Sequence, residues 1–418
     1  MKAKFETRIL KIDEIKAHPK NPKKHDEELL DQSIQEFKYV SPIVVDENNV
    51  LLVGEGRRDA MKRAGYTEVE VVVKRDLTEK QKERYLLLDN KLTERGGWNI
   101  EKLFKEFGLE DLFEAGFQAE ELSTVWNDML QIEDDEWDEE KELEKARETN
   151  IKINDLHQLG NNLLLCGDAT KPENTKRLLG KEKASMIYCD PPFNIGLDYD
   201  KGLGGKASYG GKTNDRKTDA EYRKFLAKTL ANALEVSNPD THIFYYCDQK
   251  YIGLLQDIYK ELGIKNQRVC LWIKNGFNAT PQVAFNKCYE PCVYGIKGKP
   301  YLSPIKNLNE ILNKEIGTGN RAIDDILDML DIWLVKRLSG KDYEHAAAKP
   351  PSLHEKALRR CTKVNDIVLD LFGGSGSTLI ACEQLKRRAY LCEAEPVFCQ
   401  LIINRFFKLT NIKAKLLK

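Results

Sequence analysis

The stretch from Ser185 to Asn194 constrains the fold of this 418-residue chain more than any other part of it. Its first half, Ser185–Cys189, is a short apolar run, which is typical of a buried strand in an α/β sheet. Two prolines follow, and because proline cannot continue a strand ladder, the strand must end there. Asp190 is therefore predicted at the carboxyl edge of a sheet, where open α/β folds bind their ligands.

The four residues Asp190, Pro191, Pro192 and Phe193 suit the binding of a planar amine. Asp190 and the Pro191 carbonyl can accept the two N–H bonds of the amine, while Phe193 stacks on its ring. The alternative is a strand that ends in an acidic turn and is followed by a core phenylalanine. These four residues alone leave both interpretations open.

A second pattern follows at residues 368–378, where a strand that contains Asp370 runs into a glycine-rich turn and then a helix over 379–386. Glycines let the backbone approach a ligand closely, and the start of a helix offers free N–H groups. The next strand, 388–391, leads to Glu393, which takes the place of the acid that binds ribose hydroxyls in dinucleotide folds. Loop and acid together predict a site for a nucleotide-like cofactor.

These two patterns together resemble the S-adenosylmethionine-dependent amino-DNA methyltransferases of the permuted (beta) group, in which the catalytic motif precedes the cofactor motif. The resemblance runs from about residue 153 to the C-terminus. It implies an α/β fold with a Rossmann-like sheet covered by helices on both faces, S-adenosyl-L-methionine as cofactor, and double-stranded DNA as partner.

The resemblance also implies roles for individual residues. Asp190, Pro191, Pro192 and Phe193 match the catalytic tetrapeptide, with Phe in place of the commoner Tyr. Residues 345–350 match a His…Lys-Pro element but lack its usual Pro-Thr-Gln interior. The implied cofactor-binding residues are Asp168, Lys349, Asp370, Phe372, Gly373, Gly374, Ser375, Gly376, Ser377 and Glu393.

The resemblance favours adenine N6 as the methylated atom, because Asp rather than Ser opens the tetrapeptide. Cytosine N4 is the alternative, since the same residues could hold either amine. A different class, a DNA-binding protein without catalysis, is the further alternative. The resemblance places target recognition at about residues 297–344, although few basic residues lie there and a structural insertion is the other interpretation.

Charge is distributed unevenly along the chain, although its net value is only −1. Residues 1–150 carry a net −12 and the remainder +11, and a basic C-terminal part fits a polyanionic partner. Residues 197–217 are rich in Gly, Lys and Asp without an apolar period, which predicts a loop beside the site. The candidate DNA contacts are Asn194, Lys201, Lys206, Lys212, Arg216, Lys217 and His345.

Residues 1–95 form a smaller α+β pattern with a predicted hairpin over 42–53, a helix from Arg57, and a capping box of Thr78 and Gln81 that begins a further helix. The turn Gly54-Glu55-Gly56-Arg57-Arg58 resembles the phosphate-contacting turn of the ParB/sulfiredoxin-like domain. Two glycines and two arginines before a helix suit a phosphate, of a nucleotide or of DNA. A plain strand–helix turn with solvated arginines is the alternative. Sulfiredoxin chemistry is excluded, because residues 1–95 contain no cysteine.

The remaining expectations concern organisation and surroundings. Residues 96–150 are predicted to form a helical connector whose acidic run over 133–144 is a solvated linker or helix, and residues 151–418 the methyltransferase domain. The ten cysteines include no Cys-x-x-Cys pair, which favours reduced core residues over disulfides and predicts no metal site. With no apolar run of about 18 residues and no signal peptide, we expect a cytoplasmic protein without membrane contact. The partner that we expect besides DNA is a second copy of the chain, in a homodimer.

Overall fold

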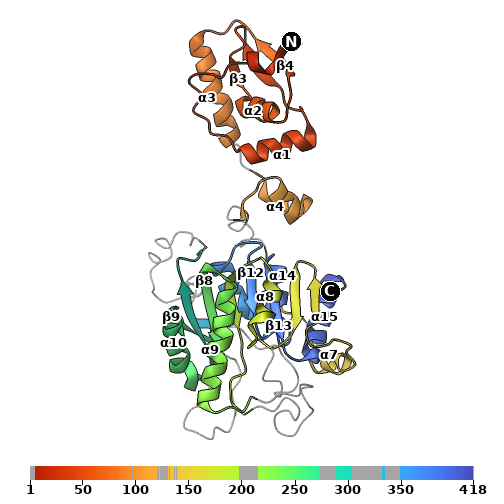
Figure 1. Cartoon of the computed structure of the whole chain (residues 1–418), viewed down its shortest axis with the longest axis vertical. Helices are drawn as coiled ribbons and strands as arrows, with labels where there is room; N and C mark the ends of the chain where they lie inside the picture. The colour runs from red at the N-terminus through yellow and green to blue at the C-terminus, as the bar shows by residue number, and fades with distance from the viewer. Residues whose placement is uncertain are drawn as a thin grey trace, which may run out of the picture. The chain divides into compact units, whose positions relative to one another are not determined.

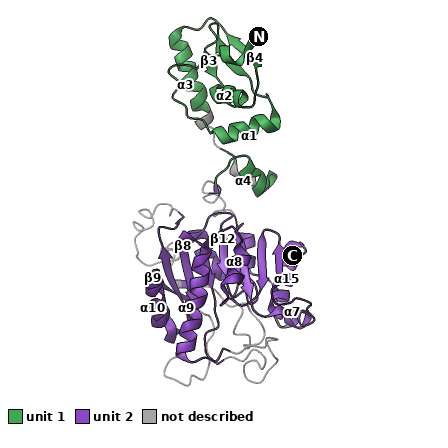
Figure 2. Ribbon diagram, in the orientation of Figure 1, with its two compact units in different colours: residues 1–118 green, residues 119–418 purple. Residues whose placement is uncertain are grey.

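The computed structural model describes residues 5–95, 98–119, 122, 130, 132–135, 137, 139–196, 215–273, 288–303, 332–334 and 349–417. The chain divides into two compact units, Met1–Gln118 and Ala119–Lys418 (Figure 2). Helices α4 (Ile100–Glu106) and α5 (Leu109–Glu114) fall in the first unit, and α7 (Glu139–Ala146) falls in the second. Within the described residues, no helix has the length and apolar character needed to span a membrane.

The first unit is built on a four-stranded sheet in the order β1-β4-β2-β3. The predicted hairpin is confirmed, since β2 and β3 pair antiparallel across residues 47–50. The predicted capping box is confirmed too, because the Thr78 and Gln81 side chains each accept a hydrogen bond from the other residue's backbone N–H. The elements are β1 (Glu6–Lys11), α1 (Glu27–Phe37), β2 (Ile43–Asp46), β3 (Leu51–Val53), α2 (Glu55–Arg63), β4 (Glu68–Lys74) and α3 (Glu79–Arg95).

The second unit is built on a ten-stranded sheet in the order β11-β9-β10-β8-β7-β12-β13-β6-β5-β14 (Figure 1). Its five central strands, from β8 to β6, are parallel, and β10 and β9 extend the sheet antiparallel. The strands are β5 (Leu156–Leu159), β6 (Asn162–Cys166), β7 (Ala184–Cys189), β8 (Ser237–Tyr246), β9 (Lys265–Ile273), β10 (Tyr289–Lys297), β11 (Ile332–Leu334), β12 (Ile367–Asp370), β13 (Arg388–Glu393) and β14 (Lys415–Leu417).

Helices cover both faces of this sheet, which confirms the predicted fold class. The period-two alternation of β7 explains both cores: Ile187 and Cys189 pack with one set of helices, Met186 and Tyr188 with the other. The first set is α8 (Pro172–Leu179), α9 (Asp219–Glu235) and α10 (Ile252–Glu261), and the second is α13 (Ser352–Cys361), α14 (Ser377–Gln384) and α15 (Pro396–Thr410) (Figure 1). Nine of the ten cysteines are buried, as predicted, and Cys288 is exposed.

The order of the central strands places a switch point between β7 and β12. The strand that follows β7 in sequence, β8, lies on one side of β7, and the strand that follows β12, β13, lies on the other side of β12. Chain segments leaving the carboxyl ends of β7 and β12 therefore diverge, and the crevice between them is where open α/β sheets bind ligands.

The acidic segment at 133–144 differs from the solvated linker that we expected. Trp137 is only 9% exposed and packs with Leu143, Val397 and Leu401. Asp135 forms a two-point ion pair with Arg405 of α15, at 2.6 and 2.7 Å. The composition of the segment concealed this contact, because one apolar ring and one well-placed carboxylate suffice to anchor an otherwise charged stretch.

Candidate active site

The motif Asp190–Phe193 leaves the end of β7 at the switch point, and neighbouring side chains hold the loop that follows. The Tyr222 hydroxyl of α9 donates to the Pro192 carbonyl at 2.8 Å. Asn194 adopts a left-handed conformation (φ 57°), and its side-chain amide bonds the Lys217 backbone and the Tyr251 hydroxyl. The Asp215 carboxylate accepts the Ile195 N–H at 3.1 Å. The motif is thus rigidly placed.

Lys349 forms an ion pair with Asp190, and this contact is the centre of the site. Its Nζ also lies 3.3 Å from Glu290 Oε2 in β10. The Lys349 side chain is 7% exposed and that of Glu290 is 9% exposed. Burial alone would lower the pKa of Lys349, but the charges of Asp190 and Glu290 outweigh burial and raise it. Lys349 is therefore a cation held between two carboxylates.

Aromatic rings surround the ammonium group of Lys349. Its Nζ lies 4.6 Å from the ring centre of Tyr246, 5.4 Å from that of Phe193 and 6.0 Å from that of Trp272. Rings at such distances attract a cation and offer flat apolar surfaces. The site therefore combines a charged centre with faces on which a planar ligand can stack.

The glycine-rich loop lies at the carboxyl end of β12, next to the motif after β7. Gly376 has φ 83° and precedes α14, and a Cβ there would lie 3.1 Å from Ile402 of α15. Gly374 has φ 51°, and its N–H donates to Glu393 Oε2 at 2.8 Å. These positive φ values are costly for any residue with a side chain, so the loop depends on glycine.

Two buried carboxylates face this loop. Burial raises the pKa of Asp370 to about 8, and the charges of Asp190 and Glu393 add to this effect. Burial likewise raises the pKa of Glu393 to about 7, although backbone N–H groups, including that of Gly374, oppose the shift. Buried carboxylates gathered at strand ends are typical of ligand sites rather than of structural cores.

A buried chain of hydrogen bonds links the end of the glycine-rich loop to β7, the strand that precedes Asp190. His354 of α13 bonds the Ser377 hydroxyl at 2.9 Å and the Tyr188 hydroxyl at 3.0 Å. Tyr188 in turn bonds the Tyr246 hydroxyl at 2.8 Å. Burial, together with the charges of Lys349 and Arg405, lowers the pKa of His354 to about 3, so this histidine is neutral.

The structure brings most of the predicted catalytic and cofactor residues to the two neighbouring strand ends. Asp168 is exposed after β6, where the adjoining Gly167 N–H bonds the Glu393 carbonyl at 2.8 Å. Phe372 packs against Phe225 and Tyr245. Lys349, which the resemblance assigned to the cofactor, contacts Asp190.

The predicted DNA contacts divide into three groups. Arg216 and Lys217 are exposed just before α9. Asn194 is buried and its amide is used in bonds within the chain. Lys201, Lys206, Lys212 and His345 lie outside the described residues, as does most of 297–344.

Sequence reasoning missed Glu290, Trp272, Tyr246 and His354. An acid inside the otherwise buried strand β10 was the available signal for Glu290, because a buried acid requires a partner.

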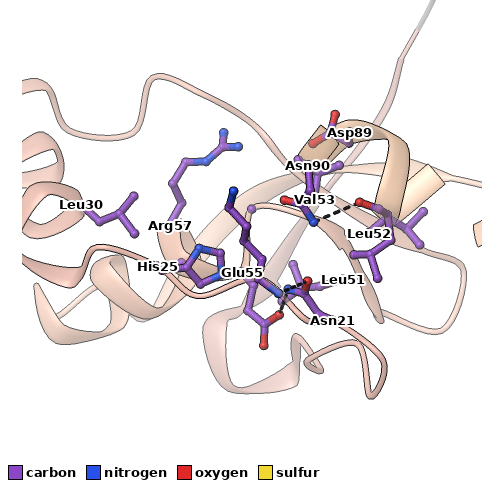
Figure 3. Close-up of a pocket in the computed structure, with 14 residues that line it drawn as sticks. Asn21, His25, Leu30, Leu51, Leu52, Val53, Glu55, Arg57, Asp89 and Asn90 are labelled. Carbon is purple, nitrogen blue, oxygen red and sulfur yellow. Dashed lines mark hydrogen bonds between the residues drawn. The ribbon is translucent and has the colours of Figure 1, made fainter. Parts of the chain in front are cut away.

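The first unit contains a pocket of about 220 Å³ at the predicted phosphate turn (Figure 3). Helix α2 begins at Glu55 rather than at Arg57, so most of the turn belongs to the helix. Gly56 is required for packing, since a Cβ there would lie 2.6 Å from Leu30 Cδ1. Arg57 lines the pocket, whereas Arg58 bonds the Ile15 carbonyl and Asp59. The lining residues are Asn21, Lys23, His25, Leu30, Leu51, Leu52, Val53, Gly54, Glu55, Gly56, Arg57, Leu86, Asp89 and Asn90.

The Asp190 carboxylate and a glycine-rich loop that meet at a switch point among parallel strands are typical of an α/β enzyme. More specifically, this chain belongs to the DNA methylase family, whose model for N6 and N4 methylases matches residues 184–404. The ParB N-terminal domain model matches residues 2–91, which lie in the first unit.

Curated relatives are type II methyltransferases. M.HpaI of Haemophilus parainfluenzae is 23% identical over 230 residues, covering 54% of this chain and 67% of the relative. M.BamHI of Bacillus amyloliquefaciens is 25% identical, over 50% of this chain and 49% of the relative. M2.DpnII of Streptococcus pneumoniae is 26% identical, over 54% of this chain and 82% of the relative. The match to M.BamHI thus spans about half of that protein.

Two solved structures are among those similar to parts of this chain. The M1.HpyAVI–SAM complex is 23% identical, with a TM-score of 0.40, and covers 58% of this chain and 97% of that one. The C-terminally truncated chromosome-partitioning protein ParB from Caulobacter crescentus, complexed with CTP-gamma-S, is 20% identical, with a TM-score of 0.24, over 35% of this chain and 88% of that one.

Proposed function

We propose that the second unit transfers a methyl group from S-adenosyl-L-methionine to the exocyclic N6 amine of adenine in double-stranded DNA, as a permuted (beta-group) methyltransferase. The observation that carries the proposal is the position of Asp190. Its carboxylate lies at the end of β7, beside the glycine-rich loop that follows the neighbouring strand β12. A base amine held by Asp190 would thus face a cofactor held by the loop.

The residues at the carboxyl ends of β12, β13 and β6 fit this cofactor. It supplies an electrophilic methyl group on a sulfonium centre, together with ribose hydroxyls and an amino group that need acceptors. Glu393 and Asp370 are buried carboxyl groups whose oxygens can accept these donors, and Asp168 follows Gly167, whose N–H bonds the Glu393 carbonyl. The space beside Gly374 is open, because a Cβ at this position would have only one atom within 4 Å. A ligand can therefore come close to the backbone of the loop there.

The chain's part in the reaction is to hold and polarise the amine. An exocyclic amine is a poor nucleophile because its lone pair is delocalised into the ring. Asp190 and the Pro191 carbonyl would accept its two N–H bonds and favour a pyramidal nitrogen. The alignment of amine and cofactor supplies most of the remaining rate acceleration, since effective molarities for well-aligned reactants reach about 10⁵–10⁸ M. Asp190 is also the nearest acceptor for the proton that the methylated amine must release.

Phe193 would stabilise the target base outside the duplex. Flipping a base costs a few kcal/mol, and stacking on an aromatic ring returns roughly 1–3 kcal/mol. Exposed Arg216 and Lys217, beside the buried Asn194, are proposed to contact DNA phosphates. Target recognition is assigned to about residues 297–344.

The direct test is mass spectrometry of nucleosides from DNA incubated with the full chain and the cofactor. N6-methyladenine is the expected product, and N4-methylcytosine would identify the alternative target. Asp190→Ala should abolish the product while cofactor binding remains nearly unchanged. Retention of more than a few per cent of wild-type turnover would remove Asp190 from its proposed role.

We further propose that the pocket of the first unit binds a phosphate group, of a nucleotide or of DNA. The pocket supports this because Lys23, His25 and Arg57 line it, although Glu55 and Asp89 line it as well (Figure 3). Calorimetric titration of the full chain with nucleoside triphosphates and with short DNA is the test. Arg57→Ala should abolish the heat of nucleotide binding and weaken DNA binding, to which the second unit also contributes, whereas Arg63→Ala, on the same helix but paired with Asp31, should do neither. Equal binding by both variants would overturn the proposal.

A further inference from the structure

The ammonium group of Lys349 has one N–H donor left for a ligand. Its ammonium carries three N–H donors and no acceptor. One donor serves Asp190 and one serves Glu290, whose Oε2 lies 3.3 Å away. The third donor remains within a site whose flat walls are the rings of Phe193, Tyr246 and Trp272.

Asp190 and Lys349 therefore present an acceptor and a donor side by side. The amino-bases carry the complementary pair. Adenine has the N6 amine next to the acceptor N1, and cytosine has the N4 amine next to the acceptor N3. In both bases the ring carbon that carries the amine is bonded to the acceptor nitrogen. A carboxylate has two oxygens, so Asp190 can bond Lys349 through one and the amine through the other.

We propose that Lys349 donates a hydrogen bond to the ring nitrogen next to the target amine, and that Glu290 is the positioning residue that holds Lys349 for this contact. The inference rests on the proposed function and deepens it. Together, the contacts of Asp190 and Lys349 would select amino-bases as a class more strongly than the contact of Asp190 with the amine alone.

The same pair rejects the keto-bases. Guanine and thymine present a carbonyl oxygen where the amine would lie, and an N–H where the acceptor would lie. The oxygen would face the Asp190 carboxylate and the N–H would face the Lys349 ammonium. Two mismatched polar contacts in a buried site are costly. Adenine and cytosine, by contrast, satisfy the pair equally, so their discrimination must come from elsewhere.

Lys349 serves recognition rather than activation. A donor at the ring nitrogen draws electron density away from the neighbouring amine, which opposes nucleophilic attack. Its benefit therefore lies in holding the correct base, and its loss should lower kcat/KM.

The test uses a substrate that lacks the proposed acceptor. Methylated sites are first mapped in DNA treated with the full chain, and duplex oligonucleotides then carry either adenine or 1-deazaadenine at the target position. The analogue keeps the amine but has C–H in place of N1. Because it pairs weakly, it flips more readily, and flipping alone would make it the better substrate. We expect kcat/KM to fall by roughly 10–100-fold instead, as for a lost hydrogen bond to a charged group.

Variants connect this loss to Lys349. In Lys349→Met the ratio of kcat/KM for adenine over 1-deazaadenine should approach one, whereas Lys349→Arg should keep most of the ratio. Glu290→Ala should lower the ratio and Glu290→Gln should restore it, because an amide oxygen still accepts the lysine's hydrogen bond. If Lys349 and Glu290 had only a structural role, their variants would lower kcat/KM for both substrates and leave the ratio of adenine over 1-deazaadenine unchanged. That result would overturn the assignment.

The outcomes also separate this inference from the proposed function. Wild-type protein that methylates adenine and 1-deazaadenine equally well would refute the role of Lys349 while the methyltransferase activity stands. Protein that methylates no DNA would refute the activity itself. If cytosine proves to be the target, 3-deazacytosine takes the place of 1-deazaadenine. The wild-type comparison needs no variant, so the test holds even if Lys349→Met fails to fold.

Discussion

The ion pair between Asp135 and Arg405 should control the stability of the second unit. Arg405 is 1% exposed, and besides Asp135 it bonds the carbonyl and hydroxyl of Ser375 in the glycine-rich loop, at 3.0 and 3.2 Å. Its guanidinium also lies 5.4 Å from the ring centre of Trp137. Asp135→Asn would leave this buried cation without its carboxylate.

The size of the effect follows from burial. Removing one partner of a buried ion pair costs about 3–5 kcal/mol. The Asp135 side chain is 18% exposed, so water can partly solvate the variant, and we expect a loss near 3 kcal/mol. In large domains Tm falls by about 2 °C for each kcal/mol of unfolding free energy that is lost, so Tm of the second unit should fall by about 6 °C.

Thermal unfolding followed by tryptophan fluorescence is the assay, because four of the five tryptophans lie in the second unit. Glu133→Gln is the matched control: it removes one charge from the same acidic segment at an exposed position, and it should change stability by less than about 0.5 kcal/mol. Adding Arg405→Met to Asp135→Asn should recover part of the loss. Equal midpoints for the Asp135 and Glu133 variants would refute the anchoring of this segment.

Three further predictions concern the cofactor loop and its support. Gly376→Val should weaken cofactor binding, measured by calorimetry, because its φ of 83° and the nearby Ile402 exclude a branched side chain; unchanged affinity would contradict this. The free energy of unfolding should fall as pH rises from about 4.5 to about 7, because the pKa of Glu393 is raised to about 7 in the folded state; Glu393→Gln should reduce this slope in denaturant titrations at several pH values. Tyr188→Phe, which removes a hydroxyl bonded to His354 and Tyr246, should cost about 1–3 kcal/mol of stability, and an unaltered denaturation midpoint would show that the chain of bonds is not needed.

The sequence predicted the elements whose signals are local. The apolar run before Asp190, the hairpin at 42–53 and the capping box at Thr78 all depend on residues close together in the chain, and the structure confirms each of them. The position of the glycine-rich loop beside the motif Asp190–Phe193 was predicted only through the resemblance. Its physical basis, the switch point between β7 and β12, requires the order of strands in the sheet.

The charged centre of the site could not be predicted from sequence. Lys349 and Asp190 are separated by 159 positions, and Glu290 comes from a third segment. No periodicity links such residues, since Asp190 follows β7, Glu290 lies in β10 two strands away in the sheet, and Lys349 precedes α13. The Asp135–Arg405 pair, 270 positions apart, was missed for the same reason.

The distribution of thiols offers a way to observe the site directly. Cys288 is the one exposed cysteine of the ten, and burial raises the pKa of others, such as Cys189 and Cys292, well above the usual thiol range. A thiol-reactive fluorophore should therefore modify Cys288 first, without any engineered substitution. Cys288 lies two positions before Glu290 at the start of β10. The unaltered protein thus carries a natural labelling position from which entry of a base beside Lys349 could be followed in real time.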